Sequence, residues 1–379
     1  MRKSQGLGFQ REYFSSREKA LTCAPYRGLY PYLIMPRSVL TFVLFILISA
    51  CEKPSSEECG LEQSLYQQAN FPLGVAVDPT YFSLPQYDTL VSKQFNSITP
   101  ENIFKPSYLH PQENSFFWPQ ADDLVARAQQ NRQRIHGHTL IWHKQLPTWM
   151  LNYQGTKAQW EAMFKNHIQS ICEHFKGKVA AWDVINEAFN EDGTLRNSIW
   201  RQHLGNGYIE KAFRYAHAAD PQALLFYNDF NLAYNERKRA AVFTFLSNLK
   251  QRGVPIHGIG MQMHIAINYP SRGQINSAIQ AAGETGLLVH LSEVDISVNP
   301  FNKGDLDKEE LFNRQADVLA TVVLAYKALP SRYQYGISFW GLSDANSWIR
   351  DFYQREDYPL LFDDFYQPKA CYCKLIDLL

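Results

Sequence analysis

The sequence lacks an excess of charge of either sign, a metal-binding cysteine pattern and a phosphate-binding glycine loop. Its 379 residues include 37 Lys+Arg and 37 Asp+Glu, so the formal net charge is +0, whereas nucleic-acid-binding proteins usually have a basic excess. The few cysteines form no CxxC pair and no Cys/His cluster at zinc spacing. No GxGxxG or GxxxxGK loop follows the first strand-like run. We therefore predict no nucleic-acid partner, no metal and no cofactor.

The apolar run nearest the N-terminus is too short to span a membrane comfortably. It extends from Val39 to Cys51, whereas a membrane-spanning helix needs about 20 apolar residues. Arg37 precedes the run, and the small residues Ser49 and Ala50 close it, which is the order of a signal peptide. The run therefore predicts export.

The end of this run, ISAC (48–51), resembles a bacterial lipobox, in which the cysteine is acylated and becomes the mature N-terminus. The resemblance implies lipidation of Cys51 and a protein on the outer membrane or cell surface that meets the membrane only through this anchor. A plain cleaved signal, which would give a periplasmic or secreted protein, and an uncleaved anchor are the alternatives. Met35 stands where a signal peptide would start, so the true start is open between Met1 and Met35.

The rest of the chain has the composition and pattern of one globular domain. Residues 1–50 form the signal region, 51–60 a polar tether and 61–379 a single domain without a linker or low-complexity block. Hydrophobic residues make up 45% and charged residues 20%, which suits a full core. Aromatic residues reach 14%, and composition cannot separate core aromatics from those of a sugar-binding cleft.

Strand-like and helix-like segments alternate along this domain. Helical spacing occurs, for example, at 121–131, 157–175, 235–253 and 313–330. The strand-like runs are 71–78, 97–101, 134–143, 180–187, 224–230, 256–264, 288–296 and 335–341. Eight strand–helix units predict an α/β fold, a closed (β/α)8 barrel of the TIM type, as a single catalytic domain. A doubly wound open sheet is the alternative, but its usual phosphate-binding loop is missing.

Nearly every strand-like run ends in polar residues that are costly to bury without a role. Active sites of such barrels lie at the carboxyl ends of the strands. The polar and aromatic strand ends are Glu101 and Asn102, His138, Trp142 and His143, Asn186 and Glu187, Asn228 and Asp229, Gln262 and His264, Glu293 and Asp295, and Trp340. Any one could be a satisfied core group, but together they predict a polar active site.

Two of these residues, Glu187 and Glu293, are carboxylates at the ends of different strands. Glycoside hydrolysis needs two carboxyl groups flanking the scissile bond, one protonated and one ionised. Metal binding is the weaker interpretation, because no His/Asp/Glu set is spaced on one element for it. Glu293 and Asp295 point to one face of a strand, so a Glu293–His264–Asp295 chain could keep Glu293 ionised. Glu187 has no such partner and is the better candidate for the general acid/base, with Glu293 as nucleophile.

The stretches that surround these residues resemble glycoside hydrolase family 10, the barrel xylanases, from about Leu61 to the C-terminus. The matching stretches are FNSITPENIFKP (95–106), GHTLIWHKQLPTW (137–149), WDVINEAFNEDGTLRNSIW (182–200), YNDFN (227–231), GIGMQMH (258–264), SEVDI (292–296), FWGLSDANSW (339–348) and PLLFDDFYQPKACY (359–372). The resemblance implies a retaining endo-1,4-β-xylanase that hydrolyses internal bonds of xylan through a covalent glycosyl-enzyme intermediate. It implies xylan and xylo-oligosaccharides as partners, and we expect a monomer.

The resemblance also implies a role for each matching residue. Glu187 and Glu293 match the family's acid/base and nucleophile. The residues that match sugar contacts at the cleavage point are His138, Trp142, Asn186, Gln262 and His264. Those that match the distal glycone subsite are Glu101, Asn102 and Lys105, with Trp340 and Trp348 as walls on the glycone side. Asn228 and Asn231 lie in the motif on the aglycone side, and Asn228 is expected to be a further substrate-binding residue.

Three departures from the family pattern put the aglycone preference in doubt. Phe230 stands where the family more often has Tyr, Met263 replaces a small residue, and Lys144 replaces a common Ser. A cellulase or mannanase on the same barrel is an alternative that two carboxylates cannot exclude. A non-catalytic carbohydrate-binding protein would have lost one glutamate. A Schiff-base aldolase would use a lysine such as Lys105, but no phosphate site accompanies it.

The remaining cysteines leave one pairing open. Cys172 lies in a helical pattern and is expected to be a buried free thiol. The first and last units of a closed barrel are neighbours, so Cys59 could pair with Cys371 or Cys373. The last two lie on a predicted helix and point about 200° apart, so only one could reach Cys59. An unpaired Cys59 in the tether is nevertheless the favoured interpretation.

Overall fold

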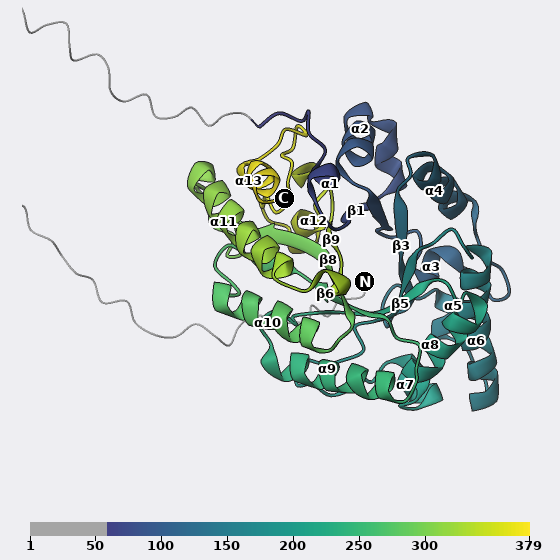
Figure 1. Cartoon of the computed structure of the whole chain (residues 1–379). Helices are drawn as coiled ribbons and strands as arrows, with labels where there is room; N and C mark the ends of the chain where they lie inside the picture. Colours follow the sequence, from purple (N-terminus) through teal and green to yellow (C-terminus); the bar gives the residue numbers. More distant parts are fainter. Residues whose placement is uncertain (1–58) are drawn as a thin grey trace, which may run out of the picture. The chain divides into compact units, whose positions relative to one another are not determined.

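The computed structural model describes residues 59–379, in which the eight predicted runs form one closed parallel barrel (Figure 1). The first strand, β1, pairs with β2 and with the last strand, β9, and β6 pairs with β8, so the sheet closes on itself. The strands are β1 (Leu73–Val77), β2 (Ser97–Pro100), β3 (Arg134–Ile141), β4 (Ala181–Asn186), β5 (Leu224–Phe230), β6 (Gly258–Gln262), β7 (His264–Ala266), β8 (Leu288–Ser297) and β9 (Gln334–Phe339). The predicted (β/α)8 barrel is confirmed.

The short strands β6 and β7 together fill one position of the barrel. Both pair with β8, and only Met263 separates them. The register sets His264 directly opposite Asp295. The side chain of His264, at the start of β7, is thereby brought to the rim beside β8.

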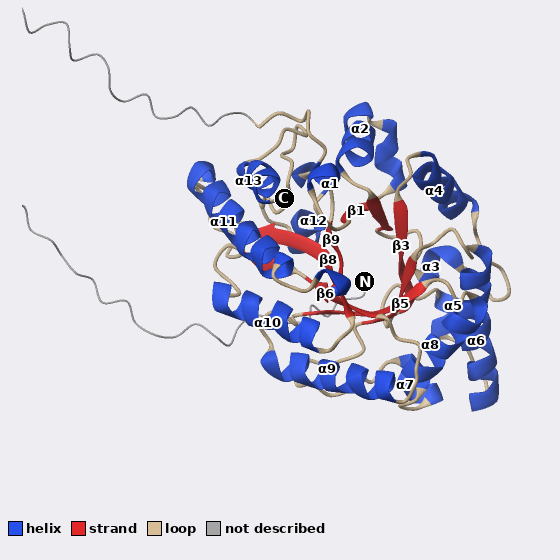
Figure 2. Ribbon diagram, in the orientation of Figure 1, coloured by secondary structure: helices blue, strands red, loops and turns tan. Residues whose placement is uncertain are grey.

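Helices cover the outside of the barrel (Figure 2). The helices are α1 (Leu65–Gln68), α2 (Pro85–Gln94), α3 (Pro106–Leu109), α4 (Pro119–Gln130), α5 (Thr148–Leu151), α6 (Lys157–His174), α7 (Ile199–Leu204), α8 (Tyr208–Ala219), α9 (Glu236–Gln251), α10 (Arg272–Glu284), α11 (Lys308–Lys327), α12 (Trp348–Tyr353) and α13 (Ala370–Leu378). The short 3-10 helices are η1 (Pro79–Ser83), η2 (Ser331–Tyr333) and η3 (Asp344–Asn346). The four long helical segments expected from the sequence are all present.

Capping side chains explain where several of these helices begin. Thr156 and Gln159 form a capping box at the start of α6, and each satisfies a backbone N–H of the other. The helix α11 begins at Lys308, earlier than the predicted start at residue 313, because Asp307 accepts from Glu310 N at its N-terminus. The helical spacing alone missed this cap.

The barrel strands are buried along nearly their whole length, as parallel strands covered by helices must be. Close packing explains one glycine in the third strand: a Cβ on Gly137 would lie 2.3 Å from the ring of Trp182. Trp160, Trp182 and Trp200 are each no more than 1% exposed. Part of the high aromatic content therefore belongs to the core.

A disulfide joins the start of the described chain to its last helix. Cys59 is bonded to Cys373 on α13, with a Cα–Cα distance of 5.5 Å. The favoured interpretation of an unpaired Cys59 was therefore wrong: barrel closure brings residues 314 positions apart into contact. As expected for a helix, only one cysteine of the 371/373 pair reaches Cys59, and Cys371 is buried and free. Cys172 is also a buried free thiol, as predicted.

The signal region and most of the tether, including Cys51, lie outside the described residues. Across residues 59–379, no helix has both the length and the apolar character needed to traverse a bilayer. The interpretation of the N-terminal segment as a lipoprotein signal therefore stays a prediction.

We predict that the Cys59–Cys373 bond stabilises the barrel. A loop of this length would contribute about 6 kcal/mol by the chain-entropy model, although measured gains are often smaller. Cys59→Ser should lower the Tm of the protein, and reductant should lower the Tm of the wild type to that of the variant. Calorimetry with and without reductant measures both effects. Cys371→Ser is the matched control, because it removes a thiol from the same helix and should keep its sensitivity to reductant. A Cys59 that is alkylated without reduction would contradict the bond.

Candidate active site

Glu293, near the end of β8, is a buried carboxylate held by two donors. Its Oε1 accepts from Asn228 Nδ2 at 2.7 Å, and its Oε2 accepts from His264 Nε2 at 3.0 Å. Hydrogen bonds donated to a carboxylate favour its ionised form. The two hydrogen bonds therefore fix the orientation of the Glu293 carboxyl group.

His264 links this carboxylate to a second one. Its Nδ1 donates to Asp295 Oδ2 at 2.8 Å, and Trp348 Nε1 donates to the same oxygen at 2.8 Å. Burial alone would lower the pKa of His264, but Asp295 and Glu293 outweigh it and raise this pKa to about 10. The imidazole is therefore a cation at neutral pH and donates from both nitrogens. The chain of contacts expected from the spacing of Glu293 and Asp295 is present.

Glu187, directly after β4, has a different environment. Its Oε1 accepts only a long hydrogen bond, 3.4 Å from Gln262 Nε2, and its Oε2 has no hydrogen-bond partner among the described residues. It is 7% exposed and its φ is +56°, a left-handed conformation that costs a non-glycine residue about 1–2 kcal/mol. A buried carboxyl group with few donors suits a group that alternates between protonated and ionised forms.

Three amide side chains lie between the two glutamates. Asn228 Nδ2 and Gln262 Nε2 approach Asn186 Oδ1 at 3.1 and 3.0 Å. The opposite orientation of the Asn186 amide would instead accept from Trp142 Nε1 at 3.3 Å. Asn228 is 0% exposed and also accepts from Ser292 Oγ at 2.6 Å. Asn228 thus contacts Glu293 directly. The sequence predicts a substrate contact on the aglycone side for Asn228 and does not predict its contact with Glu293.

The expected glycone residues Glu101, Asn102 and Lys105 form one group after β2. Lys105 Nζ donates to Asn102 Oδ1 at 3.0 Å, and Asn102 Nδ2 donates to Glu101 Oε1 at 3.3 Å. Burial lowers the pKa of Lys105 and raises the pKa of Glu101. Lys105 Nζ also lies 5.2 Å from the ring centroid of Trp142. The group presents charged donors and acceptors next to an aromatic face.

His138 is oriented by an aspartate that the sequence-based site did not include. His138 Nδ1 donates to Asp183 Oδ2 at 2.8 Å, and His136 Nε2 lies 3.0 Å from the other carboxylate oxygen. Burial would raise the pKa of Asp183, but the two histidines hold it below its usual range. A signal was available, because Asp183 is a charged residue with apolar neighbours on both sides in the strand AWDVIN. The ring of His138 packs against Trp340, with centroids 5.3 Å apart.

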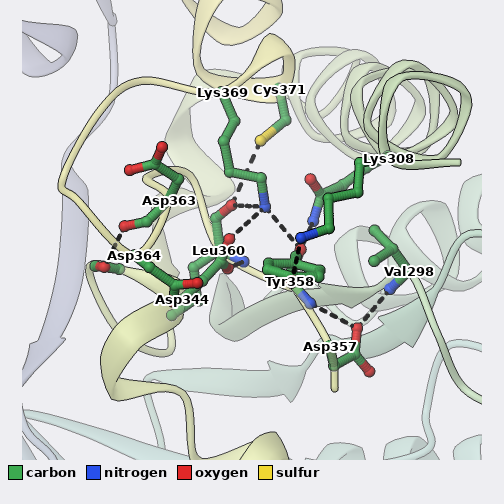
Figure 3. Close-up of polar contacts among 12 residues, drawn as sticks. Val298, Lys308, Asp344, Asp357, Tyr358, Leu360, Asp363, Asp364, Lys369 and Cys371 are labelled. Atoms are coloured by element: carbon green, nitrogen blue, oxygen red, sulfur yellow. Dashed lines mark hydrogen bonds and ion pairs between the residues drawn. The ribbon is translucent and has the colours of Figure 1, made fainter. Parts of the chain in front are cut away.

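The segment after β9, which carries Trp348, is fixed by buried charges (Figure 3). Lys369 Nζ donates to Asp344 Oδ2 at 2.8 Å and to the carbonyls of Tyr358 and Leu360 at 2.7 and 2.9 Å. Burial raises the pKa of Asp344 to about 6, although Lys369 opposes the shift.

The end of β8 is tied to the same segment. Asp357 Oδ1 accepts from Val298 N at 2.8 Å, which fixes the residue after β8 to this segment (Figure 3). Ile296 N also donates to the carbonyl of Pro359 at 3.0 Å. The contact between Trp348 and Asp295 is therefore built on a rigid frame.

A further buried network holds the segment that follows Glu187. Lys238 of α9 is 0% exposed, and its Nζ contacts Asp229 Oδ1 at 2.8 Å and Glu191 Oε1 at 3.1 Å. Burial raises the pKa of Asp229 to about 6, although Lys238 opposes the shift. Asn231, expected on the aglycone side, donates from Nδ2 to Glu191 Oε2 at 3.0 Å. Lys238 and Glu191 had no distinctive sequence signal, because both stand in polar stretches that read as solvent-facing.

Residues 59–379 contain no group of three or more His, Cys, Asp or Glu side chains that could hold a metal ion. The chemistry that the rim offers is that of its carboxyl groups. Glu293 accepts two hydrogen bonds and Glu187 accepts a single long one. This pair of carboxyl groups on one rim suits a nucleophile and a proton donor.

Comparisons with known proteins agree with this geometry. The model of glycosyl hydrolase family 10 matches residues 61–378. A β-1,4-xylanase of Dictyoglomus thermophilum is 36% identical over 89% of this chain and 98% of its own length. An endo-1,4-β-xylanase of Geobacillus stearothermophilus is 36% identical over 82% of this chain and 96% of its own. The crystal structure of xylanase 10B from Thermotoga petrophila RKU-1 in complex with xylobiose superposes with a TM-score of 0.78, at 34% identity, and covers 83% of this chain and 96% of that one.

We predict a pH-dependent contribution of His264 to stability. The pKa of His264 is raised from 6.5 to about 10 in the folded chain, so its contribution is complete below about pH 6.5 and disappears as pH rises through about 10. The difference in free energy of unfolding between wild type and His264→Gln should be largest near pH 6 and smallest near pH 10. Denaturant titrations at pH 6, 8 and 10 measure it. A difference that stays constant over this range would mean that His264 is not held as a cation.

Proposed function

We propose that this chain, which belongs to glycosyl hydrolase family 10, is an endo-1,4-β-xylanase that hydrolyses internal β-1,4-xylosidic bonds with retention of configuration. The observation that carries the mechanism is the unequal bonding of the two glutamates. Glu293 accepts from Asn228 and from a cationic His264, whereas Glu187 Oε2 has no partner among the described residues. One carboxylate is thus prepared to attack, and the other to exchange a proton.

The reaction proceeds in two displacements. A carboxylate oxygen of Glu293 attacks the anomeric carbon, the glycosidic C–O bond breaks, and the leaving oxygen takes the proton of Glu187. Glu187, now ionised, removes a proton from water, whose oxygen attacks the same carbon and releases Glu293. Two inversions leave the configuration unchanged, and both glutamates return to their starting states. The reaction requires no cofactor.

Other rim residues are proposed to bind the sugar chain. Glu101, Asn102 and Lys105 offer donors and acceptors for hydroxyl groups on the glycone side, with Trp340 and Trp348 as walls. Gln262 contacts both Asn186 and Glu187. We propose that Asn186 and Gln262 bind the sugar at the cleavage point, together with His138, Trp142 and His264. We assign Asn228 a supporting role, because a side chain that is 0% exposed and bonded to Glu293 offers no free surface to substrate.

We predict that the protein releases short oligosaccharides from xylan but not from carboxymethylcellulose. The first product detected by proton NMR should be the β-anomer, because two displacements retain the configuration. Glu293→Gln, which replaces the nucleophile by an amide of equal size, should lower kcat on xylan by at least about a thousandfold. An α-anomer as first product would contradict the double displacement, and equal release from cellulose would contradict the substrate.

We also propose that the protein is exported and anchored through a lipid on Cys51. The apolar run that ends at this cysteine supports the proposal. The Cys59–Cys373 disulfide supports it as well, because disulfides persist in oxidising compartments. The anchor would precede the first disulfide cysteine by only a few residues, and would hold the barrel close to the outer membrane or cell surface.

We predict that mature protein begins at Cys51 and partitions into detergent. Cys51→Ser should release the enzyme into the soluble fraction or block its processing, with unchanged kcat on xylan, since the residue precedes the barrel. Phase partitioning measures whether the enzyme is released, and mass spectrometry of the N-terminal peptide measures its processing. A mature N-terminus elsewhere, without a lipid, would leave a plain periplasmic or secreted enzyme.

A further inference from the structure

We propose that Tyr227, held by Asp229 and Lys238, is a positioning residue for the general acid. This inference rests on the proposed function, because it takes Glu187 as the proton donor. It assigns to a buried tyrosine the task of fixing the backbone on which the donor sits. Tyr227 does not line the sugar-binding rim, since it is 0% exposed.

The backbone at Glu187 needs such a support. Its φ of +56° is a conformation that a glutamate rarely adopts without external constraints. Two contacts from β5 meet this backbone: Glu187 N donates to the carbonyl of Asn228 at 2.9 Å, and Ala188 N donates to Tyr227 Oη at 3.1 Å. The first contact belongs to the strand ladder, whereas the second depends on a single side-chain hydroxyl.

The hydroxyl of Tyr227 is oriented by a chain of buried charges. The hydroxyl donates a hydrogen bond to Asp229 Oδ2, so a lone pair of its oxygen is directed to Ala188 N. Asp229 Oδ1 in turn contacts Lys238 Nζ at 2.8 Å, and both side chains are 0% exposed. A hydroxyl with one fixed acceptor cannot turn away from the backbone N–H, so the contact at Ala188 is preorganised.

The same cation also ties down the chain that follows the general acid. Lys238 Nζ contacts Glu191 Oε1 at 3.1 Å, and Asn235 Nδ2 donates to Glu191 Oε2 at 3.0 Å. Arg196 Nε donates to the carbonyl of Glu187 itself at 3.1 Å. The loop after β4 is therefore held at Glu187 and at Glu191, and Tyr227 provides the side-chain contact from β5 to its backbone.

Misplacing a proton donor has a consequence that general destabilisation lacks. Proton donation matters for a poor leaving group such as a sugar hydroxyl or phenol, and hardly at all for dinitrophenolate, which leaves without a proton. A lower fraction of folded enzyme reduces the rate on every substrate by the same factor. The ratio of rates on the two kinds of substrate therefore separates positioning from stability.

The test compares kcat/KM of Tyr227→Phe and wild type on phenyl β-xylobioside and on 2,4-dinitrophenyl β-xylobioside. We expect a loss of about 10- to 100-fold on the phenyl substrate and on xylan, within the range that general acid catalysis contributes, and of less than about threefold on the dinitrophenyl substrate. Lys238→Met should change the ratio in the same direction, because it leaves Asp229 without its cation.

Tyr326→Phe is the matched control. Tyr326 is also 0% exposed, and its hydroxyl also accepts from a backbone N–H, that of Gly336, while it donates to the carbonyl of Val289 at 3.1 Å. Its removal should lower both rates equally or not at all. Glu187→Ala is the reference, and should show the same pattern as Tyr227→Phe with a larger loss on the phenyl substrate.

The two proposals fail in different ways. A changed ratio in Glu187→Ala together with a wild-type ratio in Tyr227→Phe would overturn the positioning role alone. A wild-type ratio in Glu187→Ala would overturn the assignment of the general acid, and this inference with it. A ratio that changes in Tyr326→Phe as much as in Tyr227→Phe would also overturn the positioning role, since any buried hydroxyl would then have the effect.

Discussion

The parallel direction of all barrel strands is the constraint on which the rest of this enzyme depends. Parallel pairing sets every strand's carboxyl end on one rim, and the pairing of β1 with β9 closes that rim into a ring. Residues as far apart in sequence as Glu101, Glu187 and Glu293 are thereby brought to the same rim. The same closure brings Cys59 to Cys373, so the active site and the joined chain ends have a common origin.

Within this ring, each glutamate owes its character to what surrounds it. Glu293 accepts hydrogen bonds from an amide and from a histidine that Asp295 keeps charged. Glu187 is buried and accepts a single long hydrogen bond. The proposed division of labour between acid and nucleophile rests on this difference in the placement of donors.

Networks of buried charges and hydrogen bonds support the segments around both glutamates. On one side Lys369 and Asp357 fix the segment that carries Trp348, and Trp348 donates to Asp295. On the other side Lys238 and Asp229 orient the tyrosine that meets the backbone after Glu187. In both cases a buried charge is matched by an opposite charge or by backbone groups, as the cost of burying it requires.

The barrel, the two glutamates and the chain from Glu293 through His264 to Asp295 could be predicted from the sequence. These follow from local patterns: strand–helix alternation, polar residues at strand ends and the i, i+2 spacing on one strand. Three features could not be predicted, because they depend on contacts between distant segments: Asn228 contacts Glu293, Lys238 is buried between Asp229 and Glu191, and Cys59 is bonded to Cys373. The start of α11 at its Asp307 cap was also not predicted. The physical reason is that a polar residue in a helix or tether shows its burial and partners only after distant segments have packed against it.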